Sequence, residues 1–185
     1  MRKIMTVFLT LALVMGMAAC TRGSTGDENG KAPESALEIL ETVWGRYDAS
    51  EKEFMPMGGD AANAVTDGPG NHDLQDEGLV SNLLVPAEQV ANLDSAASLV
   101  NGQMLNYLVI GAYRVKTDAK AFAKAMQTSI SEARWICAPP EKMLIAVISD
   151  NYVVACFGIE NFTGPFEKHF KAAYPQAEIL YSEYL

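Results

Sequence analysis

Residues 142–159 read Lys-Met-Leu-Ile-Ala-Val-Ile-Ser-Asp-Asn-Tyr-Val-Val-Ala-Cys-Phe-Gly-Ile. Two apolar runs, 142–148 and 152–159, lie on either side of the polar residues Ser149, Asp150 and Asn151. Both runs have the length of a strand and contain many β-branched side chains, and Ser, Asp and Asn favour turns. The segment therefore predicts an antiparallel β-hairpin.

Upstream of this hairpin, the sequence predicts two strands and a helix. Asn101 and Gly102 form a strong hairpin-turn signal between an expected strand at 96–100 and a long apolar strand at 104–115. Thr117 can cap the helix that follows. The apolar residues of this helix recur at helical spacing and share one face: Phe122, Met126, Ile130 and Ala133.

Downstream of the hairpin, a second helix and a closing strand are expected. The helix covers about 163–174 with Thr163 as its cap, and Pro175 ends it. The strand covers 178–184. The resulting order, strand-helix-strand-strand-helix-strand, is that of ferredoxin-like folds. We therefore predict an α+β fold with an antiparallel sheet, helices on one face, and an added N-terminal helix and hairpin strand.

The rest of the exported part is expected to belong to the same domain, residues 33–185. Residues 33–47 carry apolar side chains at helical spacing and predict a helix. Gly, Pro, Asn and Asp are so frequent in the next thirty or so residues that we expect mostly loop there, with a long loop at 54–77. Loops of that length in compact domains are usually functional or disordered.

The N-terminus predicts export and lipid anchoring. Arg2 and Lys3 precede an apolar run, and Ala18 and Ala19 precede Cys20. This is the layout of a secretory signal over residues 1–19, too short for a transmembrane helix. Its end resembles a bacterial lipobox, in which the cysteine is diacylated before the signal is removed. The alternative is an ordinary secreted protein in which Cys20 is incidental.

The segment after the signal and the net charge of the chain limit the classes of partner that we expect. Residues 20–32 form a polar, glycine-rich tether after the lipidated cysteine. The net charge is −9 and becomes more negative once the basic signal is removed. Such a surface argues against nucleic acid, because phosphate binding needs basic residues. The expected partners are therefore the membrane, through lipid on Cys20, and a protein or small-molecule ligand.

The remaining cysteines and histidines give no catalytic set. Export permits a disulfide between Cys137 and Cys156, although two buried free thiols are the preferred interpretation. His169 is expected on a helix surface. His72 lies in the long loop and is the better functional candidate of the two, although a solvated loop histidine is the preferred interpretation. Neither histidine has a second ligand at metal-binding spacing, so no catalytic, cofactor-binding or metal-binding residue is assigned.

Two groups of residues leave alternatives open. The acidic residues of the long loop do not follow the pattern of an EF-hand, although irregular oxygen-rich loops also bind calcium; they are Asp60, Asp67, Asp73, Asp76 and Glu77. Four aromatic residues could line a ligand cleft or belong to the core: Trp44, Tyr47, Phe54 and Trp135.

The lipobox, the polar tether and the strand-helix-hairpin pattern of 104–159 together resemble a family of uncharacterised lipoproteins. These come from gut-dwelling, Gram-positive anaerobes and carry a C-terminal domain of unknown function. The resemblance covers roughly 33–174. It implies an anchored, extracytoplasmic protein, and it brings no catalytic residues.

Two functional hypotheses follow. The first is a non-enzymatic binding module, held at the outer face of the cell membrane to recruit a ligand or protein. The second is a cell-envelope hydrolase that uses carboxylates of the long loop. It would need two acids facing each other in a cleft, as in glycosidases.

Overall fold

The computed structural model describes residues 32–135 and 138–185. The predictions that concern the signal peptide, lipidation of Cys20, the tether up to residue 31, and Cys137 lie outside these residues. Within the described part, no helix is both long and apolar enough to span a membrane.

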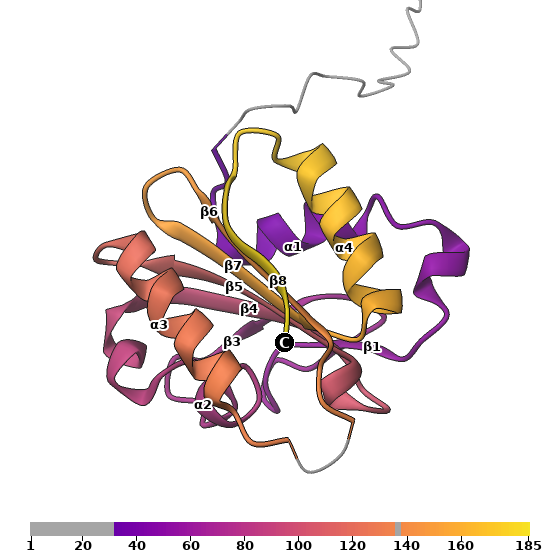
Figure 1. Cartoon of the computed structure of the whole chain (residues 1–185), viewed down its shortest axis with the longest axis horizontal. Helices are drawn as coiled ribbons and strands as arrows, with labels where there is room; N and C mark the ends of the chain where they lie inside the picture. The colour runs from indigo at the N-terminus through magenta and orange to yellow at the C-terminus, as the bar shows by residue number, and fades with distance from the viewer. Residues whose placement is uncertain (1–31, 136–137) are drawn as a thin grey trace, which may run out of the picture.

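The fold is a mixed α+β arrangement in which helices pack against an antiparallel sheet (Figure 1). The helices are α1 (Ala36–Trp44), α2 (Gly78–Ser81), α3 (Ala119–Glu132) and α4 (Glu160–Ala173), with short 3-10 turns η1 (Ala49–Lys52), η2 (Ala87–Asn92) and η3 (Leu105–Tyr107). The strands are β1 (Pro56–Gly58), β2 (Val65–Thr66), β3 (Gly70–His72), β4 (Leu93–Asn101), β5 (Leu108–Val115), β6 (Lys142–Ile148), β7 (Tyr152–Gly158) and β8 (Glu178–Tyr184).

The predicted hairpin lies at the centre of the sheet. β6 pairs with β7 from Lys142↔Gly158 to Ile148↔Tyr152, and the main strands follow the order β4-β5-β7-β6-β8. Nearly every residue of β5, β6 and β7 is buried. Both faces of the sheet are covered, and therefore these strands are apolar at consecutive rather than alternate positions.

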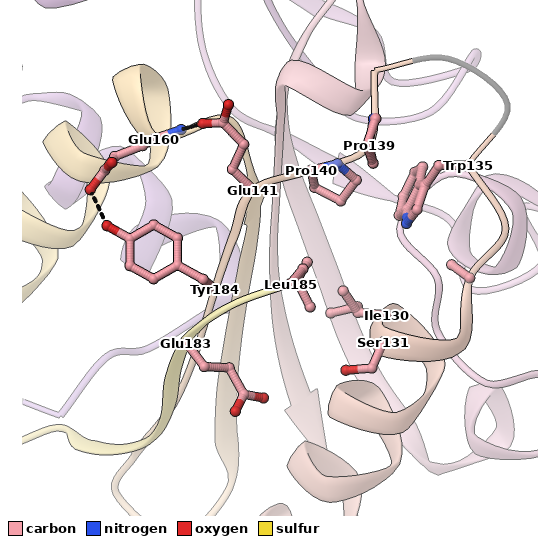
Figure 2. Close-up of a pocket in the computed structure, with 11 residues that line it drawn as sticks. Ile130, Ser131, Trp135, Pro139, Pro140, Glu141, Glu160, Glu183, Tyr184 and Leu185 are labelled. Carbon is pink, nitrogen blue, oxygen red and sulfur yellow. Dashed lines mark hydrogen bonds between the residues drawn. The ribbon is translucent and has the colours of Figure 1, made fainter.

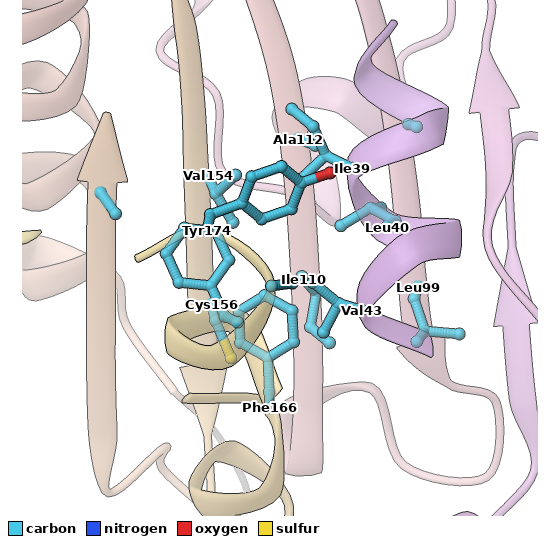
Figure 3. Packing of buried hydrophobic residues seen from close by; sticks show 14 of the residues in the cluster. Ile39, Leu40, Val43, Leu99, Ile110, Ala112, Val154, Cys156, Phe166 and Tyr174 are labelled. Carbon is cyan, nitrogen blue, oxygen red and sulfur yellow. The ribbon is translucent and has the colours of Figure 1, made fainter. Parts of the chain in front are cut away.

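The helices pack on both faces of the sheet, so the expectation of helices on one face is wrong. One face carries α1 and α4, whose residues pack in a single cluster with alternate residues of the strands (Figure 3). The opposite face carries α2 and α3, which pack against the other set of alternate residues. The result is a three-layer molecule with two separate hydrophobic clusters.

The position of β8 explains this placement. The elements follow each other in the ferredoxin-like succession β5-α3-β6-β7-α4-β8, but β8 pairs with β6, and β4 occupies the outer edge of β5. The chain therefore crosses from β5 to β6 and from β7 to β8 in the same direction along the sheet. The two crossovers start, however, from strands β5 and β7, which run antiparallel to each other. Crossovers are almost always right-handed. Two crossovers of the same hand that start from antiparallel strands place their helices, α3 and α4, on opposite faces. The specific ferredoxin-like sheet order is therefore not confirmed.

The segment expected to be a long loop contributes three short strands to the sheet edge. β1 and β3 both pair with β4, and β2 pairs with β1. The backbones of Gly58 and Gly70 approach so closely that a Cβ on Gly58 would lie 2.2 Å from the nitrogen of Gly70. Only glycine permits this contact. The glycines that predicted a loop therefore serve in part to bring two strands together.

Several predicted boundaries are shifted. Asn101 does not form a two-residue turn, because the last pair before it is Val100↔Val109; its side chain instead accepts hydrogen bonds from the N–H groups of Gln103 and Met104. Asp118, not Thr117, caps α3. The closing helix begins at Glu160, so Thr163 lies within its first turn and is not its cap.

Candidate functional site

A cavity lies at the end of the sheet where α3, β6 and β8 meet (Figure 2). Its volume is about 760 Å³. The described residues that line it come from four segments of the chain: Ile130, Ser131, Ala133, Trp135, Pro139, Pro140, Glu141, Glu160, Glu183, Tyr184 and Leu185. A concave site with apolar walls and a few convergent polar groups is the usual form of a ligand pocket.

A chain of hydrogen bonds fixes the acidic side of this pocket. The N–H of Glu160 donates to Oε2 of Glu141 over 2.9 Å, and the hydroxyl of Tyr184 donates to Oε1 of Glu160 over 2.6 Å (Figure 2). The N–H of Leu185 donates to the carbonyl of Glu141. These bonds connect the start of β6, the start of α4 and the end of β8. The carboxylates are therefore held in place by contacts between segments that are distant in the sequence.

Carboxylates outnumber basic groups at this pocket, although the ammonium group of Lys142 lies beside it, 5.9 Å from the ring centroid of Tyr184. Glu141, Glu160 and Glu183 line it, and none of the lining residues that the structure describes is Lys, Arg or His. The pKa of Tyr184 is raised, first by its hydrogen bond to Glu160 and then by the charge of that carboxylate, while the charge of Lys142 opposes the shift and Glu141 adds a smaller contribution to it. Removing the proton from Tyr184 is disfavoured because it would add another negative charge to this group.

Apolar side chains form the other walls. Figure 2 shows Trp135 and Tyr184 on opposite sides of the pocket, with Leu185 and Ile130 between them. Trp135 is fixed from behind by Phe157, whose ring centroid is 5.8 Å from its own. The pocket thus combines carboxylates with two aromatic rings.

Among these residues, the sequence pointed only to Trp135 as a candidate for lining a ligand cleft. It also grouped Trp135 with three aromatic residues that lie elsewhere: Trp44, at the end of α1, contacts the rings of both Tyr47 and Phe54. The three glutamates were missed because they are separated by 19 or more residues and follow no motif. Only the pairing of β8 with β6 brings Glu183 and Tyr184 to the same end of the sheet as Glu141.

The acidic residues of 54–77 are largely engaged in local structure. Asp60 accepts hydrogen bonds from the N–H groups of Ala62, Asn63 and Asp73. Asp73 accepts from the N–H of Gln75. No group of three or more His, Cys, Asp or Glu residues in the described ranges is arranged to hold a metal ion.

Both histidines differ from their expected settings. The side chain of His72 is only 4% exposed, and its ring bridges Asp76 and Ser98, with Nδ1 3.0 Å from Oδ2 of Asp76 and Nε2 2.8 Å from Oγ of Ser98. His169 is buried on α4, and its Nε2 lies 2.6 Å from a carboxylate oxygen of Glu51. The expectations of a solvated loop histidine and a surface helix histidine are therefore wrong.

The bonds around His72 follow the order acid, imidazole, hydroxyl, which is that of a Ser-His-Asp triad. Ser98, however, is only 1% exposed, and its hydroxyl oxygen also accepts the N–H of Gly59. In this geometry the bonds connect 59–76 to the middle of β4. Their direct effect is to hold this segment on the sheet.

Cys156 is a free thiol and is fully buried in the cluster beneath α1 and α4. This agrees with the preferred interpretation for that residue.

The comparisons with known proteins give no match. No family model, no curated protein and no solved structure matches this chain. The functional argument therefore depends on the sequence signals and on the geometry of the pocket.

Proposed function

We propose that this protein is an exported lipoprotein, held at the outer face of the cell membrane through lipid on Cys20, and that its folded domain is a non-enzymatic binding module. The signal layout that ends in Met17-Ala18-Ala19-Cys20 supports the anchor. Two acyl chains give a stable attachment where one would be marginal. The tether of 20–32 would let the domain reach roughly 20 Å from the membrane.

The observation that carries the binding role is the pocket between α3 and β8. It is about 760 Å³ in volume, within the range of small-molecule sites, and carboxylates and aromatic rings from separate segments face it. The relation to uncharacterised lipoproteins of gut-dwelling, Gram-positive anaerobes is part of the same proposal. It rests on the lipobox, the tether and the strand-helix-hairpin pattern.

The anchor is tested by intact-mass analysis of protein purified from its native membrane, with Cys20→Ala as the matched variant. We expect a mature chain that begins at Cys20 and carries a diacylglyceryl group, and we expect the variant to lack it. An unlipidated wild-type chain released into the medium would contradict the anchor.

The binding role is tested with Trp135 as a fluorescent reporter. The chain has two tryptophans, so Trp44→Phe leaves Trp135 alone. We expect at least one compound in a panel of envelope sugars, peptides and amines to change its emission saturably. Ala133→Phe, which adds a ring at the pocket wall, should abolish the response. If no compound gives a response that this variant removes, the binding proposal is wrong.

A second candidate is a cell-envelope hydrolase, although not one that uses a pair of loop carboxylates as expected from the sequence: Asp76, His72 and Ser98 are hydrogen-bonded in the order of a catalytic triad. We rank it below the binding module because Ser98 is 1% exposed. A fluorophosphonate probe, which reacts with activated serines, distinguishes the two. Labelling of the wild type that is lost in Ser98→Ala would favour the hydrolase. If the wild type is not labelled, the hydrogen bonds of His72 to Asp76 and Ser98 have a structural role only.

A further inference from the structure

The methionines of the domain are divided between the core and one end of the sheet. Five methionines lie in the described residues, and two of them, Met126 and Met143, are fully buried. The other three are at least partly exposed, with Met55 at 44% and Met104 at 42%. Side chains this exposed contribute little to the core, so packing does not account for them. We refer to Met55, Met57 and Met104 as the methionine cluster.

Met55 and Met57 lie on one face of the sheet and meet over Gly102. Met57 pairs with Val100, and the N–H of Gly102 donates to the carbonyl of Met55 over 2.8 Å. Residues two apart in a strand point to the same face. A Cβ on Gly102 would collide with both Sδ of Met57 and Cε of Met55. The two thioether side chains therefore fill the space that the missing Cβ leaves.

Met104 joins this pair from the turn that follows β4. The side chain of Asn101 accepts hydrogen bonds from the N–H groups of Gln103 and Met104, and these bonds fix the turn. Two residues of chain span at most about 7 Å, so the backbone of Met104 lies close to Gly102. Its long side chain starts within reach of the other two. Three thioethers can therefore converge at this end of the sheet.

The chemistry of the thioether group selects the ligand. Its sulfur is a soft, uncharged donor, and soft sulfur ligands favour Cu(I) over cations such as Mg²⁺ and Ca²⁺, which prefer oxygen. A methionine side chain has three rotatable bonds and a polarisable sulfur, so the cluster can adjust around an ion. The exposure of Met55 and Met104 leaves the ion a path from solvent.

We propose that the sulfur atoms of Met55, Met57 and Met104 bind one Cu(I) ion. The site lies among β1, the end of β4 and the turn that follows it, and it shares no residue with the lining of the pocket between α3 and β8. The inference therefore goes beyond the proposed binding role and does not depend on it.

The test uses Ag(I), a redox-inert soft cation, as the probe in chloride-free buffer. The protein is the full mature chain with Cys20→Ala and Cys137→Ser, so that the only thiol left is Cys156, which is fully buried. Methyl groups of methionine are labelled with ¹³C and followed by NMR. We expect Ag(I) to shift the resonances of the three cluster methionines and to leave those of Met126 and Met143 in place. Cu(I) under ascorbate should give the same pattern, and Ca²⁺ should give none.

A matched pair of variants tests the sulfur atoms themselves. Met57→Leu keeps the size of the side chain and removes the donor, so it should weaken Cu(I) binding about tenfold in competition with a chromophoric chelator. Met126→Leu makes the same change in the core and should leave the affinity unchanged. Circular dichroism checks that both variants are folded.

The pH dependence distinguishes thioethers from other ligands. A thioether carries no proton to displace at neutral pH, whereas metal binding by histidine or cysteine releases protons and weakens as the pH falls. The affinity for Ag(I) should therefore be constant between pH 6 and pH 8. An affinity that falls with pH would assign the ion to a different group.

The remaining outcomes are decisive for this site. If millimolar Ag(I) shifts none of the cluster methionines, or if Met57→Leu and Met126→Leu bind Cu(I) equally well, the inference is wrong. Ala133→Phe, which fills the pocket, should leave Ag(I) binding unchanged. The failure of one site can therefore be told apart from the failure of the other.

Discussion

Asp60 illustrates at the scale of single residues how a carboxylate stabilises an irregular segment. It is 7% exposed and accepts backbone N–H groups from both sides of the segment that contains β2. These bonds lower the pKa of Asp60 to about 2, with the N–H of Asp73 as the largest contribution. A carboxylate in this position is needed because two oxygens must accept at once.

Replacing Asp60 by Asn should therefore destabilise the domain. The amide has only one acceptor oxygen and would leave a buried N–H unpaired, which costs about 1–3 kcal/mol. Urea unfolding at neutral pH measures this loss. Glu77→Gln is the control, because Glu77 is exposed and makes no side-chain cap bond to α2, and it should change stability by less than about 0.5 kcal/mol. Equal losses in the two variants would contradict the role of Asp60.

The same residue gives a pH dependence. Its pKa in the folded protein lies below the value of about 3.9 expected in the unfolded chain. The stabilisation is therefore complete above that value and is lost as the pH falls towards 2. The difference in unfolding free energy between wild type and Asp60→Asn should shrink between pH 5 and pH 2.5. A constant difference over this range would show that the pKa of Asp60 is the same in the folded and the unfolded protein, which would contradict the role of these hydrogen bonds.

Among the elements, α4 shows how a helix continues through a proline. Pro165 lies inside the helix and cannot donate to the carbonyl four residues before it. The residue before a proline is normally excluded from helical backbone angles by a clash with its Cβ. Gly164 has no Cβ and so avoids this clash, and apart from its chain neighbours and the backbone of the same helix no atom lies within 4 Å of where a Cβ would be. The Gly164-Pro165 pair is therefore compatible with a continuous helix.

These two positions should be coupled in a double-mutant cycle. Pro165→Ala restores a helical hydrogen bond and should stabilise the protein by about 1–3 kcal/mol. When Pro165 is already replaced, Gly164→Ala should stabilise the protein by about a further 0.5–1 kcal/mol, because alanine is then the better helix former. Gly164→Ala alone should be neutral or destabilising. Additive effects in thermal unfolding would contradict the steric explanation.

At the scale of the whole molecule, the central strands connect two hydrophobic clusters. β5, β6 and β7 contribute alternate residues to the layer under α1 and α4 and to the layer under α3. Loss of either layer would expose one face of the same strands to water. We therefore expect the domain to unfold as one cooperative unit.

The accessibility of the Cys156 thiol tests whether the domain unfolds as one unit. It is fully buried in the α1–α4 layer, and burial raises the pKa of its thiol well above the ordinary value. In a Cys20→Ala, Cys137→Ser chain at pH 8, it should not react with a thiol reagent until the protein unfolds. Its labelling should follow the same urea transition as the loss of circular dichroism. Labelling at lower urea would show that the α1–α4 layer opens by itself.

By itself, the sequence determined the local features of this protein. The apolar runs gave the strands of the central hairpin, and helical spacing gave α1, α3 and α4, because these patterns depend on residues within one or two turns of each other. The sequence also carries the prediction of export and lipidation at Cys20, since such signals are contiguous.

The tertiary structure alone decided which strands pair and what their pairing brings together. Periodicity reports which side chains are buried but not which edge β8 joins, and that choice sets the faces of α3 and α4. It also gathers Glu141, Glu160 and Glu183 around one pocket, and it brings His72 to Ser98 and His169 to Glu51. These contacts join residues far apart in the chain, so their energies depend on the folded arrangement and have no local signature.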